Sequence, residues 1–158
     1  MSEKDDAIGA LETGYVEFRE LLVALPDAAY GEVWLGTWDA DHLLAHMAGW
    51  YREMAGAFGR VAKGERPAPE GVDYSNADEW NAKFAASPQH ASAALDDFDM
   101  AFHEYYAAAK ALPDGMYGID PASGRPRIGN RLLQGAGIGH FEEHRPEVEA
   151  WLASRTPR

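Results

Sequence analysis

The sequence contains no cysteine, and this absence removes several kinds of chemistry at once. Disulfide bonds, thiolate zinc ligands and a cysteine nucleophile are all excluded. A reaction of this chain that uses a thiol must therefore take the thiol from a small co-substrate.

Basic residues are scarce as well. The 158 residues include 14 Lys and Arg against 26 Asp and Glu, which gives a formal net charge of −12. Binding to a phosphate backbone relies on clustered Lys and Arg, so this balance argues against a nucleic-acid partner.

Long apolar runs are also missing. No stretch approaches the roughly 20 residues of a membrane span, and Met1–Asp6 lacks the basic-then-apolar order of a signal peptide. We therefore expect a cytoplasmic protein without a membrane partner. Its length suits a single domain over residues 1–158.

The sequence does contain a clear helical periodicity. Apolar residues recur at three- and four-residue steps in four segments, which predicts four amphipathic helices. They cover about residues 8–25 before Pro26, 39–63 before Gly64, 87–112 before Pro113 (with Ser87 and Pro88 as cap and first turn), and 128–153. Residues 65–87 form a long crossover in which Asn76 precedes one short helix. The sequence thus predicts an all-α four-helix bundle.

The expected fourth helix carries residues that disfavour a regular helix. Pro146 removes a backbone hydrogen bond, which predicts a kink just beyond His144. Gly135, Gly137 and Gly139 each cost up to roughly 1 kcal/mol relative to alanine unless close packing or ligand access compensates. We interpret these glycines as making room between helices.

Three of the six histidines lie on the inward faces of predicted helices. His140 and His144 are four residues apart, so their rings lie one helical turn apart on the same side. His46 lies between Leu43 and Trp50 on the second helix, where it is available as a third ligand. A buried imidazole needs a hydrogen-bond partner or an ion. We predict a divalent metal site at His46, His140 and His144, with a coordination position open for water or substrate.

Other interpretations of the histidines stay open. His42 and His46 form a second pair at the same spacing, although His42 falls in the first helical turn and is expected to face solvent. His90 and His103 have no partner at such a spacing, and we interpret both as surface residues. Even the pair on the fourth helix could be a hydrogen-bonded polar pair without an ion.

Two glutamates and two aromatic residues lie near the predicted ligands in the sequence. Glu142 should project away from the metal face, whereas Glu143 lies about 60° from His140 around the helix and is a candidate partner of a ligating histidine or a general base. The competing interpretation is a solvated glutamate. We interpret Trp50 and Tyr51 as core residues in the first place, and they are also candidates for a pocket wall.

Three motifs resemble the DinB-like superfamily, which includes the DinB, mycothiol-dependent maleylpyruvate isomerase N-terminal and ClbS-like groups. The segment Thr37–Trp50 resembles the second-helix pattern, in which a tryptophan precedes a Leu-x-His segment and another aromatic residue follows. The segment Gly139–Trp151 resembles the fourth-helix His-x-x-x-His pattern, and Glu79–Asn81 is similar to a recurrent crossover segment. Together, and in this order along the chain, these motifs match the predicted helices to those of the superfamily.

The resemblance implies a bundle of up-down-down-up topology that frequently forms homodimers, with a divalent ion, often zinc or nickel, on three histidines. The matching positions in this sequence are His46, His140 and His144. The resemblance also implies chemistry on small molecules. Some relatives are S-transferases or isomerases that use mycothiol or bacillithiol, and the ClbS-like branch includes hydrolases of reactive toxins.

We therefore expect a metal-dependent enzyme that acts on a small electrophilic molecule, by transfer of a low-molecular-weight thiol or by hydrolysis. The sequence does not distinguish these two reactions. The alternative from another class is a non-catalytic bundle that binds or sequesters a small molecule, because an apolar cavity with a few polar groups describes binding and catalytic sites equally.

Overall fold

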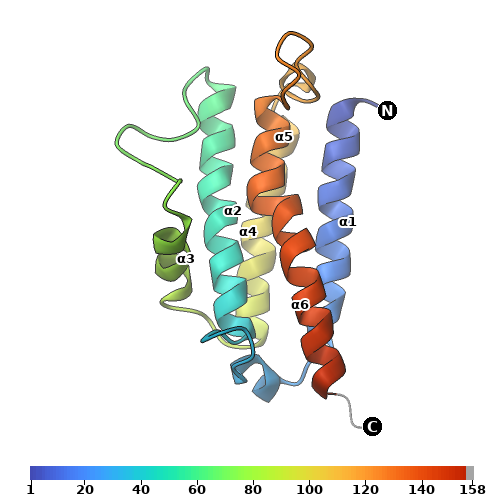
Figure 1. Ribbon diagram of the computed structural model, residues 1–158, viewed down its shortest axis with the longest axis vertical. Helices are drawn as coiled ribbons and strands as arrows, with labels where there is room; N and C mark the ends of the chain where they lie inside the picture. Colours follow the sequence, from blue (N-terminus) through green and yellow to red (C-terminus); the bar gives the residue numbers. More distant parts are fainter. Residues whose placement is uncertain (156–158) are drawn as a thin grey trace.

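The computed structural model describes residues 1–155, so the last three residues of the predicted domain lie outside the described part (Figure 1). The six α-helices in this range are α1 (Glu3–Val23), α2 (Ala40–Ala62), α3 (Ala77–Ala85), α4 (Ser92–Ala111), α5 (Ile128–Leu133) and α6 (Gly139–Arg155). Two 3₁₀ turns, Asp27–Gly31 and Asp114–Met116, and one π-helical turn, Gln134–Ile138, accompany them. The all-α prediction is confirmed. None of these helices is long and apolar enough to span a bilayer.

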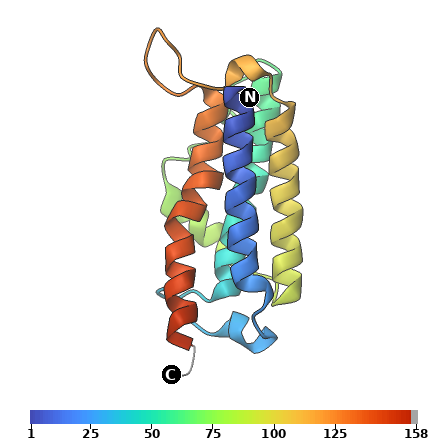
Figure 2. The ribbon, with the colours of Figure 1, turned by 90° about the vertical axis from the view of Figure 1, so that its right-hand side faces the viewer.

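The bundle consists of four long helical rods, the last of which is α5 and α6 joined end to end. The rods of α1 and α5–α6 run in one direction, and those of α2 and α4 run in the opposite direction (Figure 1, Figure 2). This is the predicted up-down-down-up arrangement. The crossover returns along the outer side of α2 and carries α3, which packs against α2. The short helix predicted in the crossover is therefore confirmed.

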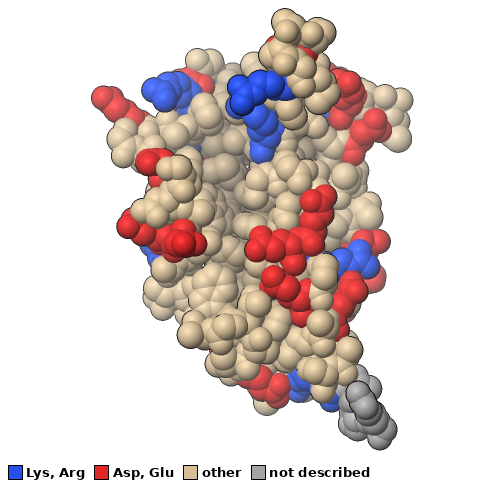
Figure 3. Space-filling view, in the orientation of Figure 1, with Lys and Arg blue, Asp and Glu red and all other residues tan. Residues whose placement is uncertain are grey.

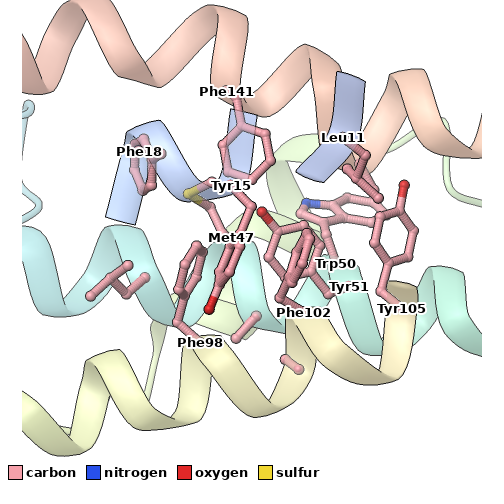
Figure 4. Close-up of a cluster of buried hydrophobic side chains, with 14 of the residues drawn as sticks. Leu11, Tyr15, Phe18, Met47, Trp50, Tyr51, Phe98, Phe102, Tyr105 and Phe141 are labelled. Carbon is pink, nitrogen blue, oxygen red and sulfur yellow. The ribbon is translucent and has the colours of Figure 1, made fainter. Parts of the chain in front are cut away.

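Aromatic side chains from all four rods build the core (Figure 4). The buried rings include Phe18 of α1, Tyr51 of α2, Phe98 and Tyr105 of α4, and Phe141 of α6. The ring of Phe98 lies 5.9 Å from that of Phe18 and 5.7 Å from that of Tyr51. Phe141 contacts the same two rings at 5.6 and 6.4 Å. This packing fixes the position of α6 relative to α2, the two helices that carry the candidate ligands.

Capping side chains account for the starts of two helices. The Ser2 side chain accepts the Asp5 N–H at 3.1 Å, and the Asp5 carboxylate accepts the Ser2 N–H at 3.2 Å, which makes a capping box for α1. Asp39 caps α2 by accepting the His42 N–H at 2.9 Å. The second helix therefore begins where its sequence predicts.

The third long helix begins later than predicted. The sequence favours a start at Ser87–Pro88, but α4 begins at Ser92. The preceding residue, Ala91, has φ of 52°, a conformation that is uncommon for a residue with a Cβ atom. The buried Asp41 carboxylate holds this turn, since it accepts the Ala91 N–H at 2.9 Å and contacts Nδ1 of His90 at 2.6 Å. The start of α4 is therefore set by the contact with Asp41, and not by the capping signal at Ser87 and Pro88.

We expect Asp41→Asn to lower the free energy of unfolding by roughly 1–3 kcal/mol, because the amide offers one acceptor oxygen where the carboxylate offers two. Asp41 also raises the pKa of His90 by a hydrogen bond. That contact therefore stabilises the fold most below the unfolded-state pKa of histidine, and its contribution fades as the pH rises through the folded-state value. Urea unfolding at pH 5.5 and pH 8 measures both effects.

The matched control for this prediction is His90→Gln. It should remove the pH-dependent part of the stability and keep the part that comes from the bond between Asp41 and the Ala91 N–H. An Asp41→Asn variant as stable as the wild type at both pH values would contradict the role of this carboxylate.

The last rod is not one regular helix. The sequence predicts a continuous helix over residues 128–153 with a kink at Pro146, but the interruption lies in the π turn Gln134–Ile138, and α6 runs through Pro146. Figure 1 shows the ribbon stepping sideways where α5 passes into α6. A π turn of this kind inserts an extra residue into the helical ladder, and such turns are frequent at functional sites.

The three glycines of this segment have different reasons for lacking a side chain. A Cβ on Gly137 would lie 2.5 Å from Cδ1 of Leu11, and one on Gly139 would lie 2.4 Å from the carbonyl oxygen of Gln134. Gly135 meets no such neighbour. The prediction that glycine makes room between helices is therefore confirmed at Gly137, whereas Gly139 fits the close approach of the backbone within the π turn.

Candidate metal centre

The three predicted ligands come together between α2 and α6. The ring centroid of His46 lies 4.9 Å from that of His140 and 5.5 Å from that of His144. The centroids of His140 and His144 are 5.6 Å apart. Each ring offers one nitrogen, and these three nitrogens lie within 4.8 Å of one another. Imidazole groups that converge in this way are a common donor set for a divalent ion.

The surroundings of these rings disfavour protonation. His46 and His144 are buried, and His140 is half-buried. Burial, reinforced by the neighbouring histidines, lowers the pKa of His46 to about 3. The same causes lower the pKa of His140 to about 4. Both imidazoles are therefore neutral at neutral pH, which is the form that binds metal ions.

Two ring nitrogens of the cluster have no partner. Nδ1 of His46 and Nδ1 of His140 are buried and make no hydrogen bond of normal geometry within the described residues, although the Leu43 and Ala136 backbones lie near the His46 and His140 rings, respectively. Unpartnered polar atoms are costly in a protein interior, and a bound ion is one way to compensate them. The residues present therefore fit the divalent ion that the resemblance implies.

Glu147 orients the third histidine. Its Oε2 lies 3.2 Å from Nδ1 of His144, three residues earlier on α6. A carboxylate in this place fixes the proton on Nδ1 and leaves Nε2 to face a ligand. The sequence made Glu143 a candidate for such a role, and its Oε2 lies 3.9 Å from Nε2 of His144. Glu147 was not predicted, although the i, i+3 spacing from His144 was a signal for it.

The structure places the other predicted candidates outside the cluster. His42 is half-buried rather than solvent-facing, and its Nδ1 lies 2.6 Å from Oδ1 of Asp39. His90 and His103 are exposed, as predicted. Glu142 is also exposed, and its carboxylate accepts a hydrogen bond from Gln134, which confirms that it projects away from the histidines.

A pocket of about 650 Å³ opens beside the cluster, between α2, the crossover and the α5–α6 rod. This volume lies within the range of small-molecule sites. Its walls are mostly apolar and include Met54, Leu132 and Ala136. His140 belongs both to the cluster and to the pocket wall, so the two form one site. Figure 3 shows the hollow on this face of the molecule.

The crossover supplies one polar wall of the pocket. The indole N–H of Trp50 donates to Oδ1 of Asn81 at 2.6 Å, and the hydroxyl of Tyr74 donates to Oε2 of Glu53 at 2.9 Å. Because an indole N–H can only donate, Oδ1 of Asn81 must face Trp50, and the amide Nδ2 remains as a donor. Asn81 belongs to the crossover motif found in the sequence, but its role depends on the packing of α3 against α2.

Tyr51 differs from its predicted role, and Trp38 makes a contact that the sequence did not predict. Tyr51 was a candidate for the pocket wall, but it is fully buried in the bundle core and does not line the pocket. Trp38, in the loop before α2, packs against His46 at a centroid distance of 5.0 Å. The tryptophan of the Thr37–Trp50 motif is therefore a neighbour of the candidate ligand.

The chain is similar to a known protein family. A family model for the mycothiol maleylpyruvate isomerase N-terminal domain matches residues 11–124, a range that includes His46 and ends before His140. No curated protein sequence shows significant similarity to the chain.

Several solved structures share the fold. The colibactin self-resistance protein ClbS, in a complex with dsDNA, is 14% identical with a TM-score of 0.80, over 98% of this chain and 97% of ClbS. DfsB, a sibling lethal factor precursor, is 13% identical with a TM-score of 0.76, over 98% of each chain. The mycothiol-dependent maleylpyruvate isomerase is 17% identical with a TM-score of 0.69, over 94% of this chain. The chain spans 63% of the length of that isomerase.

These comparisons bear on two predictions. Because the ClbS structure is a complex with dsDNA, the expectation that this acidic chain binds no nucleic acid stays a prediction. The match to the family model covers most of the chain, and the neighbours share the helical bundle found here. The chain belongs to the mycothiol maleylpyruvate isomerase N-terminal domain family, within the DinB-like superfamily.

Proposed function

We propose that this chain is a metal-dependent enzyme that acts on a small electrophilic molecule, with a divalent ion, zinc or nickel, held by His46, His140 and His144. The observation that carries the proposal is the cluster of three imidazoles, two of them with unpartnered buried Nδ1 atoms, at the wall of a pocket of about 650 Å³. Three protein ligands leave a coordination position open, as catalytic rather than structural ions require.

When bound, such an ion lowers the pKa of a coordinated water or thiol, so that hydroxide or thiolate forms near neutral pH. Side chains of the pocket would supply the proton acceptor and the hydrogen-bond donor. Glu143 lines the pocket next to His140, so its carboxylate is placed to accept the released proton. The amide of Asn81 is a donor for a carbonyl oxygen of the substrate, and the apolar walls exclude water from the reacting atoms.

Thiol transfer and hydrolysis are the two reactions that this arrangement supports. The absence of cysteine means that the thiol would be a small co-substrate. The relative named as mycothiol-dependent favours the thiol route. The experiment is turnover of an activated aryl halide and of an activated ester by the zinc-loaded protein, with and without a low-molecular-weight thiol.

Turnover that requires both thiol and metal, and that His46→Ala abolishes, would support the S-transferase. Turnover without thiol would support the hydrolase. A protein that binds zinc and small molecules but turns over neither compound under any of these conditions would contradict the enzyme and favour a non-catalytic binding bundle.

Glu147→Ala tests the orientation of His144 in particular. We expect this change to weaken zinc binding about 10- to 100-fold, because loss of the carboxylate at Nδ1 frees the ring to rotate and to change tautomer. Zinc affinity, measured by competition with a chromophoric chelator, is the readout. Glu142→Ala, on the same helix but with its carboxylate away from the cluster, is the control. An equal effect of both substitutions would point to general charge rather than to orientation.

A further inference from the structure

The pocket beside the histidines carries opposite charges along its length. Arg131 of α5 lines it, and so does Glu143 of α6, next to His140. Arg131 and His140 lie nine residues apart on one helical rod, so their backbones are separated by more than roughly 10 Å along it, even though the π turn lies between them. Between them, Leu132 and Ala136 make the wall apolar.

The side chain of Arg131 has no partner within the described residues, in contrast to those of Arg19 and Arg155. Arg19 pairs with Asp99 at 3.0 Å, and Arg155 pairs with Glu32 at 2.9 Å. No hydrogen bond or ion pair engages the guanidinium of Arg131 within residues 1–155, and it is the one cation that lines this pocket. Figure 3 shows basic atoms over α5 above the hollow and acidic atoms over α6 beside it.

The remaining polar groups set the orientation of a ligand. In the metal-free protein Glu143 repels an anionic group from the end of the pocket where His140 lies. Arg131 attracts one at the other end, and its planar guanidinium can bind a carboxylate through two parallel hydrogen bonds. A carboxylate carries one charge, which one guanidinium balances, whereas a phosphate brings up to two, and Arg131 is the one Lys or Arg side chain of residues 1–155 that lines this pocket.

We infer that the substrate is an elongated, largely apolar carboxylic acid, whose carboxylate binds Arg131 at one end of the pocket and whose reactive end lies at the histidines. The inference rests on the proposed function, because it names the substrate class of the same site. The apolar body of the acid packs between Trp50 and Leu132, and the neutral end approaches His140 and Glu143.

The test uses metal-free protein, so that it depends neither on an ion nor on turnover. The probe is decanoate, with 1-decanol as its neutral counterpart, and the measurement is isothermal titration calorimetry. Decanoate should bind the wild type more tightly than 1-decanol. Arg131→Gln should weaken decanoate binding by at least about 10-fold, the loss expected for a hydrogen bond to a charged group, and should leave 1-decanol binding unchanged.

The matched control is Arg125→Gln, which removes the same charge from an exposed residue outside this pocket and should leave both affinities unchanged. Unaltered decanoate binding by Arg131→Gln would overturn the inference, and so would equal binding of decanoate and 1-decanol or no decanoate binding by the wild type. Tighter binding of decyl phosphate than of decanoate would overturn the assignment to a carboxylate.

The outcomes separate this inference from the proposed function. Decanoate binding that depends on Arg131, in a protein that shows no turnover when loaded with zinc, would support the carboxylate site and contradict the proposed enzyme. Turnover that survives Arg131→Gln without change in KM would support the proposed enzyme and contradict the carboxylate site.

Discussion

Replacement of His46 by alanine is expected to lower the affinity for zinc by more than about 100-fold, a larger effect than the loss of a residue that only orients a ligand. His46 is the ligand that α2 contributes to the cluster, and without it the ion would be left with His140 and His144 from one helix. Elemental analysis of protein purified without a histidine tag should find about one divalent ion per chain in the wild type and none in His46→Ala or His140→Ala.

The bundle itself should tolerate this change. In the metal-free protein His46→Ala removes a buried nitrogen that has no partner, so the lost packing is offset in part. His42→Ala is the matched control, because His42 lies one turn earlier on α2 and contacts Asp39 instead of the cluster. It should retain the ion. A wild-type protein that holds no metal even after reconstitution would contradict the metal centre.

Phe98→Ala should lower the free energy of unfolding by about 3–5 kcal/mol, the usual effect of removing a fully buried phenylalanine. The ring is 0% exposed and contacts Phe18, Tyr15 and Tyr51, so its removal leaves a cavity bounded by α1, α2 and α4. Urea unfolding of the metal-free protein, followed by circular dichroism, measures the loss.

The control for this prediction is Met100→Ala. Met100 lies two residues later on α4 and is 64% exposed, so its substitution should change the stability by less than about 0.5 kcal/mol. A loss below about 1 kcal/mol for Phe98→Ala would mean that the core refills the cavity.

The helices and the candidate ligands could be predicted because both depend on local spacing. The recurrence of Leu11, Tyr15 and Phe18 at three- and four-residue steps defines the buried face of α1, and each of these residues is buried. The spacing of His140 and His144 requires only that their segment be helical. His46 could be added because inward-facing residues of neighbouring helices must meet in a bundle.

Features that depend on contacts between distant segments could not be predicted. The start of α4 depends on Asp41, which lies in α2 and has no sequence relation to Ala91. The place of Arg131 in the pocket depends on how the crossover packs, and a lone arginine on a helix carries no signal of its own. The homodimer and the cytoplasmic location stay predictions.

The distance along the chain between His46 and His140 has a consequence for folding. An ion shared by α2 and α6 would close a loop of about 94 residues and so restrict the unfolded chain, the effect that a disulfide has in other proteins. This chain has no cysteine with which to form one. Because the complete ligand set exists only in the folded bundle, the fraction of folded molecules, and with it their resistance to proteases, would rise and fall with the supply of the ion in the cell.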